Sequence, residues 1–260
     1  MLKVENLTKV YEDGTVALKN VSFEVPDGAF MSVIGLSGSG KSTLLRCINR
    51  LIEPTEGHIF WHDMDISRVQ GEELRMVRRK IGMVFQQFNL VKRSSVMTNV
   101  LTGRLGYVRP MWSLVNRFPR EDRERAVAAL KRVGLQDKAR NRADALSGGQ
   151  QQRVGIARAL MQEPEMILAD EPVASLDPVL AHSILGQLES LNKEDGLTVM
   201  CSLHYLDLVQ RYSTHVIGLR AGELVFEGDN QAIREMTDER FKEIYGEEAS
   251  RVGAGSLTGQ

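Results

Sequence analysis

Cysteine is scarce in this chain of 260 residues, which contains only Cys47 and Cys201. Two thiols cannot build a disulfide framework, and they fall short of the four ligands of a structural zinc site. No stretch approaches the ~18 uninterrupted apolar residues of a membrane-spanning helix. The first residues are charged and lack the apolar core of a signal peptide. We therefore expect a soluble cytoplasmic protein.

Net charge is also nearly absent, at −1, but the average hides an uneven distribution. Residues 68–142 carry 18 Lys and Arg against 6 Asp and Glu, whereas the rest of the chain carries 15 against 28. This basic segment has two interpretations. It is either a surface that faces an anionic partner, such as nucleic-acid phosphates or the cytoplasmic leaflet, or a set of solvated helix faces.

Short apolar runs alternate with helical patterns, which indicates a parallel α/β sheet. The expected strands are 2–7, 16–25, 29–34, 58–61, 80–85, 166–169 and 197–202, followed by a closing hairpin at 215–219 and 223–226. The expected helices are 42–51, 121–133, the stretch from the LSGGQ sequence to residue 160, and 178–192. Strand signals fade between about 90 and 160, where we predict an inserted helical subdomain in a single domain spanning 1–245. Residues 246–260 are predicted to form a short polar tail.

Residues 35–42, GLSGSGKS, match the pattern G-x-x-x-x-G-K-[ST] between a strand and a helix, where this phosphate-binding loop occurs. Glycines let backbone N–H groups turn towards an anion, and the helix N-terminus adds partial positive charge. Lys41 is predicted to reach the β- and γ-phosphates, and the Ser42 hydroxyl to bind Mg²⁺. The candidate ATP-binding residues of this loop are Gly35, Ser37, Gly38, Ser39, Gly40, Lys41, Ser42 and Thr43.

Two carboxylates follow the apolar run 166–169. The carboxyl end of a buried parallel strand is where α/β proteins place ligands. Asp170 is therefore a candidate for the Mg²⁺ shell, and Glu171 for the general base that polarises the attacking water. Alone, such a pair is more often the start of a solvated loop. Together with Lys41 and Ser42, it favours a nucleotide-hydrolysing site.

Residues 146–150, LSGGQ, resemble the signature of the ATP-binding cassette (ABC) ATPases, and the resemblance extends over roughly 1–245. It implies a P-loop NTPase of the ABC type, with a RecA-like parallel sheet core, an antiparallel β subdomain and an inserted α-helical subdomain. Further family motifs occur in the correct order. Tyr11 resembles the aromatic residue that stacks on adenine, Gln86 the Q-loop glutamine near Mg²⁺ and the water, Asp177 the D-loop aspartate, and His204 the switch histidine that contacts the γ-phosphate.

The resemblance also implies a head-to-tail homodimer, in which the signature of one subunit contacts ATP held by the other. The signature residues carried over are Ser147, Gly148, Gly149 and Gln150. ATP would hold the dimer closed, and hydrolysis would let it open.

One cassette without a membrane span fits a separate importer subunit, peripheral at the cytoplasmic face of the membrane. It would dock on two permease subunits and serve a solute-binding protein outside the membrane. Several segments resemble phosphonate importer ATPases in particular: 91–96 (VKRSSV), 98–101 (TNVL), 103–107 (GRLGY), 143–147 (ADALS), 170–178 (DEPVASLDP), 217–222 (IGLRAG) and 244–246 (IYG). The alternatives are an importer of phosphate, phosphite or a polar amino acid. A less favoured alternative is a nucleic-acid-associated cassette ATPase. No nucleic acid is expected as a partner.

In importers of this family, a short permease helix enters a groove beside the Q-loop. The candidates to line such a groove are Phe85, Phe88, Leu90, Val91 and Val100. For Phe85 and Val100, a place in the core is at least as good an interpretation.

Overall fold

The computed structural model describes residues 1–107, 118–235, 237, 239, 244 and 245. The polar tail expected at 246–260 lies outside the described residues, as does Gly246 of the IYG motif. The chain divides into two compact units, one formed by Met1–Arg68 together with Thr198–Gln260, the other by Val69–Leu197. Each unit contains part of the expected motifs: the phosphate loop lies in the first, and the paired carboxylates and the LSGGQ sequence lie in the second.

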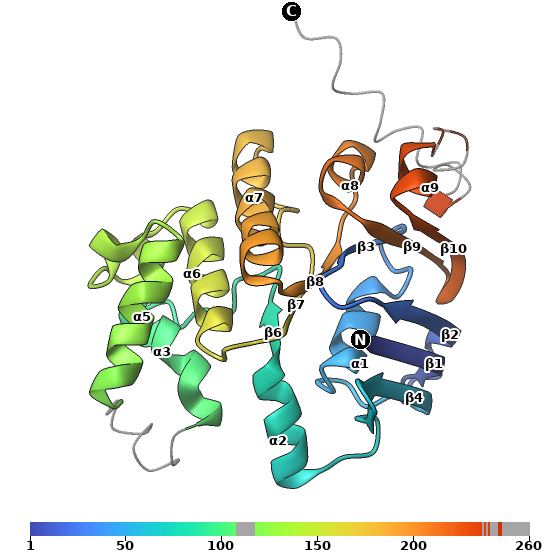
Figure 1. Ribbon diagram of the computed structural model, residues 1–260, viewed down its shortest axis with the longest axis horizontal. Coiled ribbons are helices and arrows are strands. Elements are labelled where there is room, and N and C mark those ends of the chain that lie inside the picture. Colours follow the sequence, from blue (N-terminus) through green and yellow to red (C-terminus); the bar gives the residue numbers. More distant parts are fainter. Residues whose placement is uncertain (108–117, 236, 238, 240–243, 246–260) are drawn as a thin grey trace, which may run out of the picture. The chain divides into compact units, whose positions relative to one another are not determined.

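An antiparallel sheet forms one part of the first unit (Figure 1). Its strands are β1 (Leu2–Val10), β2 (Val16–Val25), β4 (Glu56–Trp61) and β5 (Met64–Asp65), in the order β2-β1-β4-β5. Alternation in the second half of β2 buries Val21, Phe23 and Val25 and exposes the residues between them. Such a period of two is typical of a strand with one face on the core.

A second set of strands in this unit has the order β10-β9-β3-β8. β3 (Phe30–Ile34) pairs in parallel with both β8 (Thr198–Ser202) and β9 (His215–Arg220), and β10 (Glu223–Asp229) closes an antiparallel hairpin with β9. Every residue of β3 and β8 is buried, as expected for strands covered on both faces. The helices with printed bounds in the described part of this unit are α1 (Lys41–Ile48), α8 (Leu206–Tyr212) and α9 (Asn230–Arg234).

The second unit contains the parallel pair β6 (Ile81–Val84) and β7 (Met166–Ala169), both fully buried. Helix α2 (Gly71–Lys80) leads into β6, and α7 (Pro178–Asp195) follows β7. Helices α3 (Val96–Leu101), α5 (Arg120–Arg132) and α6 (Gly148–Leu160) pack against one another (Figure 1). Three 3₁₀ turns, η1 (Thr102–Gly106), η2 (Gln136–Lys138) and η3 (Ala143–Ala145), lie between them.

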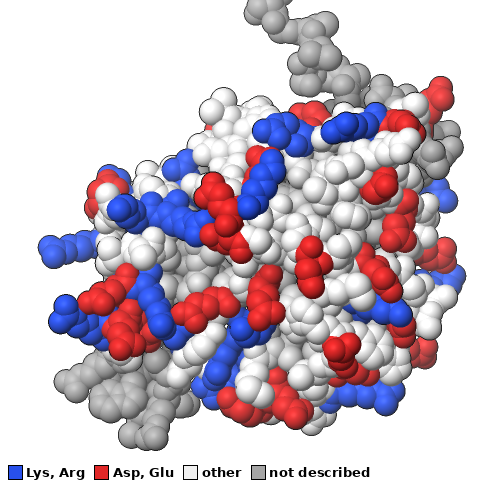
Figure 2. Space-filling model, in the orientation of Figure 1, with Lys and Arg blue, Asp and Glu red and all other residues white. Residues whose placement is uncertain are grey.

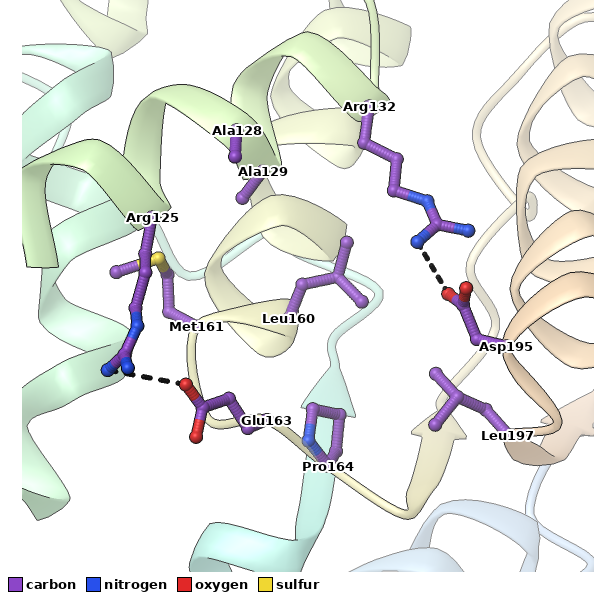
Figure 3. A pocket seen from close by; sticks show the side chains of 10 residues that line it. All are labelled: Arg125, Ala128, Ala129, Arg132, Leu160, Met161, Glu163, Pro164, Asp195 and Leu197. Atoms are coloured by element: carbon purple, nitrogen blue, oxygen red, sulfur yellow. Dashed lines mark ion pairs between the residues drawn. The ribbon is translucent and has the colours of Figure 1, made fainter. Parts of the chain in front are cut away.

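A cavity of about 330 Å³ lies between α5, the turn after α6 and the end of α7 (Figure 3). Its middle is apolar, and an ion pair stands at each side: Arg125 to Glu163 at 3.3 Å and Arg132 to Asp195 at 2.7 Å. These pairs attach α5 to the neighbouring elements. None of the predicted site residues lines this cavity.

Most expected elements occur within a few residues of their predicted ends, and β2 and β7 match residue for residue. Among the helices that the structure describes, four were not predicted: α2, α3, α8 and α9. α2 buries only Val77, so it lacks the apolar stripe that reveals a helix in sequence. The other three have five to seven residues, too short for a helical period to repeat. Among the described helices, none is both long and apolar enough to cross a bilayer.

Candidate functional site

The loop after β3 has the form of an anion-binding turn that leads into α1. Gly40, the residue before α1, has a left-handed φ of 105°, and a Cβ there would lie 2.4 Å from the carbonyl oxygen of Ala17. At Gly35, a Cβ would lie 2.2 Å from the carbonyl oxygen of Leu219. Only glycine fits at either position, because the neighbouring atoms belong to the main chain. The loop is thus held closely by the backbone around it.

Two polar side chains of the loop are buried. The ammonium of Lys41, 3% exposed, donates to the carbonyl oxygens of Gly35 at 2.7 Å and Leu36 at 2.8 Å. Ser39 Oγ is buried and finds no hydrogen-bond partner among the described residues. A buried hydroxyl without a partner is costly unless a ligand supplies one. The glycine cradle, the buried ammonium and this hydroxyl fit a bound phosphate chain.

Two further predicted residues belong to the same unit. The hydroxyl of Tyr11 lies 3.2 Å from Thr43 Oγ1, so the candidate adenine-stacking ring stands beside the start of α1. His204 follows β8 by two residues, and the N–H of Leu203 donates to the carbonyl oxygen of Val33 in β3 at 3.1 Å. Because β3 and β8 are parallel neighbours, the phosphate loop and His204 emerge at the same edge of the sheet.

The second unit repeats this arrangement with different chemistry. β6 and β7 are parallel, and the N–H of Asp170 donates to the carbonyl oxygen of Val84 at 2.9 Å. Gln86 and Glu171 therefore lie just beyond neighbouring strand ends, and Gln86 Nε2 donates to Glu171 Oε2 at 2.8 Å. Glu171 has a left-handed φ of 47°, which is uncommon for a residue with a Cβ. Such backbone conformations concentrate at functional sites.

The LSGGQ sequence folds as the start of a helix. Ser147 is the N-cap of α6, and its Oγ accepts from the N–H of Gln150 at 3.4 Å. Gln150 Oε1 accepts in return from the N–H of Ser147 at 3.1 Å, which completes a capping box. Gly148 and Gly149 leave the first turn of α6 without side chains, Gly148 half-buried and Gly149 buried against the side chain of Leu180.

The predicted D-loop aspartate also caps a helix. Asp177 Oδ1 accepts from the N–H of Leu180 at 3.0 Å, and Pro178 occupies the first position of α7. An aspartate at the N-cap and a proline at the first helical position are both favoured at the start of a helix. A Cβ on Gly148 would touch the side chains of Leu176 and Phe88 at 3.6 and 3.8 Å, so the signature, the D-loop and the Q-loop are close neighbours within this unit.

Comparison with known proteins agrees with this geometry. The family model described as ABC transporter matches residues 18–174. The chain belongs to the ABC transporter family. It is 52% identical to the phosphonates import ATP-binding protein PhnC of Shouchella clausii, over 95% of this chain and 91% of the relative. It is 51% identical to the protein of the same name from Bdellovibrio bacteriovorus, over 99% and 98%.

Solved ATP-binding cassettes have the same fold. One, determined as a dimer in a post-hydrolysis state bound to ADP and Pi, superposes with a TM-score of 0.78 at 39% identity, covering 88% of this chain and 99% of that one. Another, in an ADP conformation, gives a TM-score of 0.82 at 33% identity, covering 94% and 97%. The predicted family, the likeness to phosphonate importer ATPases and the ABC-type P-loop fold are therefore confirmed.

The burial of the groove candidates decides between the two interpretations of Val100. Val100 is 0% exposed, so it belongs to the core and cannot line a groove. Val91 is 58% exposed, whereas Phe85, Phe88 and Leu90 are half-buried. Sequence reasoning also missed Arg158, whose guanidinium contacts two Q-loop carbonyls. No motif singled out this arginine, because its partners are about 70 residues away in the chain.

The basic segment 68–142 does not stand alone in the folded cassette. Several of its cations pair with acidic residues beyond it, such as Lys80 with Glu165 at 2.9 Å and Arg132 with Asp195 at 2.7 Å. On the face drawn in Figure 2, basic and acidic side chains are interspersed. Ion pairing of this kind favours the interpretation as solvated helix faces.

Proposed function

We propose that this chain is the ATP-hydrolysing subunit of an importer that powers uptake of phosphonates through separate permease subunits. The observation that carries the proposal is the identity of about half of all residues with phosphonate import ATP-binding proteins, over nearly the whole chain. Gln86 hydrogen-bonded to a strained Glu171 supports hydrolysis, rather than nucleotide binding alone.

The phosphate loop binds the triphosphate of ATP. Lys41 gives up its two carbonyl contacts for β- and γ-phosphate oxygens, which are stronger acceptors because they are charged. Ser39 and the backbone N–H groups of Gly38 and Gly40 satisfy the remaining oxygens, and Tyr11 stacks on adenine. Ser42, Gln86 and Asp170 are the residues that would hold Mg²⁺. The ion, when bound, offsets the negative charge of the phosphates.

Hydrolysis needs a water that is aligned and deprotonated as it attacks. Glu171 accepts the proton while the water oxygen bonds to the γ-phosphorus and the bond to the bridging oxygen of ADP breaks. Gln86 keeps the Glu171 carboxylate in place and helps to align the water. His204 donates a hydrogen bond to the γ-phosphate.

Two copies of the chain form the working ATPase. Ser147, Gly148, Gly149 and Gln150, at the N-terminus of α6, meet the γ-phosphate of ATP held by the partner subunit, and Asp177 lies beside that contact. The dimeric solved cassette supports this assembly. Two permease subunits and a solute-binding protein complete the importer, with the ATPase peripheral at the cytoplasmic face. The cassette spans 1–245 and carries its helical subdomain at about 90–160.

The first prediction tests this function at Glu171. Glu171→Gln removes the proton acceptor and keeps the size of the side chain, so ATPase turnover falls by about 100-fold or more while ATP affinity stays within about twofold. The measurements are steady-state ATPase, nucleotide binding, and uptake of radiolabelled methylphosphonate in a deletion strain that carries either gene.

Glu165→Gln is the matched control, because it removes an exposed carboxylate whose ion pair with Lys80 lies at the surface. It should turn over ATP like the wild type. ATPase near the wild-type rate in Glu171→Gln would refute the assignment of the base. Uptake of phosphate or phosphite instead of methylphosphonate by the complemented strain would refute the substrate while leaving the ATPase intact.

A further inference from the structure

The Q-loop of this cassette contains a strained turn. Phe88 and Asn89, consecutive residues, both have left-handed φ angles, of 56° and 47°. A residue with a Cβ is disfavoured in that region, a bulky one such as Phe88 more than Asn89. Two in succession persist only where the surroundings hold them.

One side chain supplies that hold. Arg158, on α6, donates from Nη1 to the carbonyl oxygen of Asn89 at 2.5 Å and from Nη2 to that of Phe88 at 2.9 Å. Its guanidinium carbon also lies 5.8 Å from the centre of the Phe85 ring. Burial lowers the pKa of this guanidinium from its ordinary value, yet an arginine stays charged at neutral pH. The fork of a charged guanidinium thus fixes two successive peptide groups.

The helix that carries Arg158 is fixed at both ends. Its N-terminus has the Ser147 capping box described above. Just beyond its C-terminus, Arg104 Nη1 donates to the carbonyl oxygen of Met161 at 3.2 Å, and the Tyr107 hydroxyl to that of Gln162 at 2.5 Å. The first of these bonds satisfies the carbonyl group of the C-cap, which has no intrahelical partner, and the second holds the residue after it. The helix that positions Arg158 is therefore fixed by hydrogen bonds at both of its ends.

The strained turn begins two residues after Gln86, whose amide donates to Glu171. We propose that Arg158 is a positioning residue: by holding the Phe88–Asn89 turn, it places Gln86 against Glu171 and so sets the rate of hydrolysis. The effect on rate depends on the proposed function, whereas the hold on the Q-loop does not. Because Arg158 and the signature lie on one helix, a displacement of α6 carries the Q-loop with it.

The test compares Arg158→Ala and Arg158→Lys with Arg153→Ala in the full-length protein. Arg153 is the matched control: it is half-buried on the same helix and donates to Ser183 Oγ at 2.9 Å, away from the Q-loop. Hydrogen exchange is followed in peptides covering 85–90, and kcat and KM for ATP are measured in parallel.

Arg158→Ala should raise exchange at 85–90 by about tenfold and lower kcat by about 10- to 100-fold, the cost of a misplaced catalytic group, with KM changed less than twofold. Arg158→Lys, which keeps a cation but not the fork, should fall between Arg158→Ala and wild type. Arg153→Ala should stay within twofold of wild type in both measurements.

Unchanged exchange at 85–90 in Arg158→Ala would overturn the inference, whether or not the protein hydrolyses ATP. The inference would also be overturned if Arg158→Ala and Arg153→Ala lost kcat equally. The same holds if the KM for ATP rose by as much as kcat fell in Arg158→Ala, since either pattern indicates general damage to α6. A wild-type protein without ATPase activity would instead overturn the proposed function. The exchange measurement would then decide the role of Arg158.

Discussion

The phosphate loop and the Q-loop each follow a buried parallel strand, but they keep their shapes by different means. The phosphate loop is held by nearby backbone and by its own Lys41, which bonds to carbonyl groups five and six residues earlier. The Q-loop is held by side chains from other elements: Arg158 from α6, and Asn99 from α3, whose Oδ1 accepts from the N–H of Val91 at 2.7 Å.

This difference separates two kinds of functional loop. A loop that is enclosed by main chain and bonded to itself by its own lysine does not depend on any one distant side chain. A loop held by distant side chains responds to any shift of the elements that carry them. We infer that the phosphate loop is the constant part of this ATPase, and the Q-loop the part that can register movement of α6 and α3.

The largest expected effect tests the first half of this comparison. Gly40→Ala would place a Cβ 2.4 Å from the carbonyl oxygen of Ala17 and keep φ at 105°, so it should lower the free energy of unfolding by about 3 kcal/mol or more. Gly28→Ala is the control, because Gly28 also has a positive φ, of 72°, but open space around it. It should cost only about 1 kcal/mol.

Chemical denaturation of both variants measures the difference. Equal losses of stability would mean that backbone conformation alone matters at Gly40. The idea that the main chain around the phosphate loop fixes its shape would then be wrong.

A smaller effect tests the second half. Ser147→Ala removes the N-cap of α6, which should cost about 1 kcal/mol of stability and loosen the support of Arg158. Exchange at 85–90 should rise two- to threefold, although the substitution lies some 60 residues away. Ser147→Thr, which keeps a hydroxyl at the cap, should leave both quantities near wild type. An unchanged Q-loop in Ser147→Ala would show that α6 does not need its cap to hold Arg158.

The same contrast explains what the sequence alone could predict. The phosphate loop and the pair of Asp170 with Glu171 are patterns of adjacent residues, each with a chemical reason for its spacing, and the structure places both directly after buried strands. β7 was predicted to the residue because four buried apolar residues stand between polar ones. Local chemistry was enough in each case.

The features that escaped prediction depend on contacts between distant residues. Nothing near Arg158 in the chain indicates that it bonds to residues 88 and 89. For Val100 the sequence left both a groove and the core open, because an apolar residue near a loop looks the same in sequence whether it faces a partner or the core. α2 is so polar that no apolar pattern indicates a helix there, although acidic residues in its first turn and basic ones in its last stabilise one.

The smallest expected effect is an absence of change, measured at a cysteine beside the phosphate loop. Cys47, on α1, is buried, and burial raises the pKa of its thiol to about 12. Only about one thiol in ten thousand is then a reactive thiolate at pH 8. Iodoacetamide should therefore label Cys47 and the buried Cys201 slowly in the native protein and rapidly in guanidinium chloride. Since both cysteines lie in the unit of the phosphate loop, Arg158→Ala should not change their native labelling rate. A clear rise in the labelling rate of either cysteine in Arg158→Ala would mean that the phosphate loop depends on the Q-loop. The contrast between the two loops would then not hold.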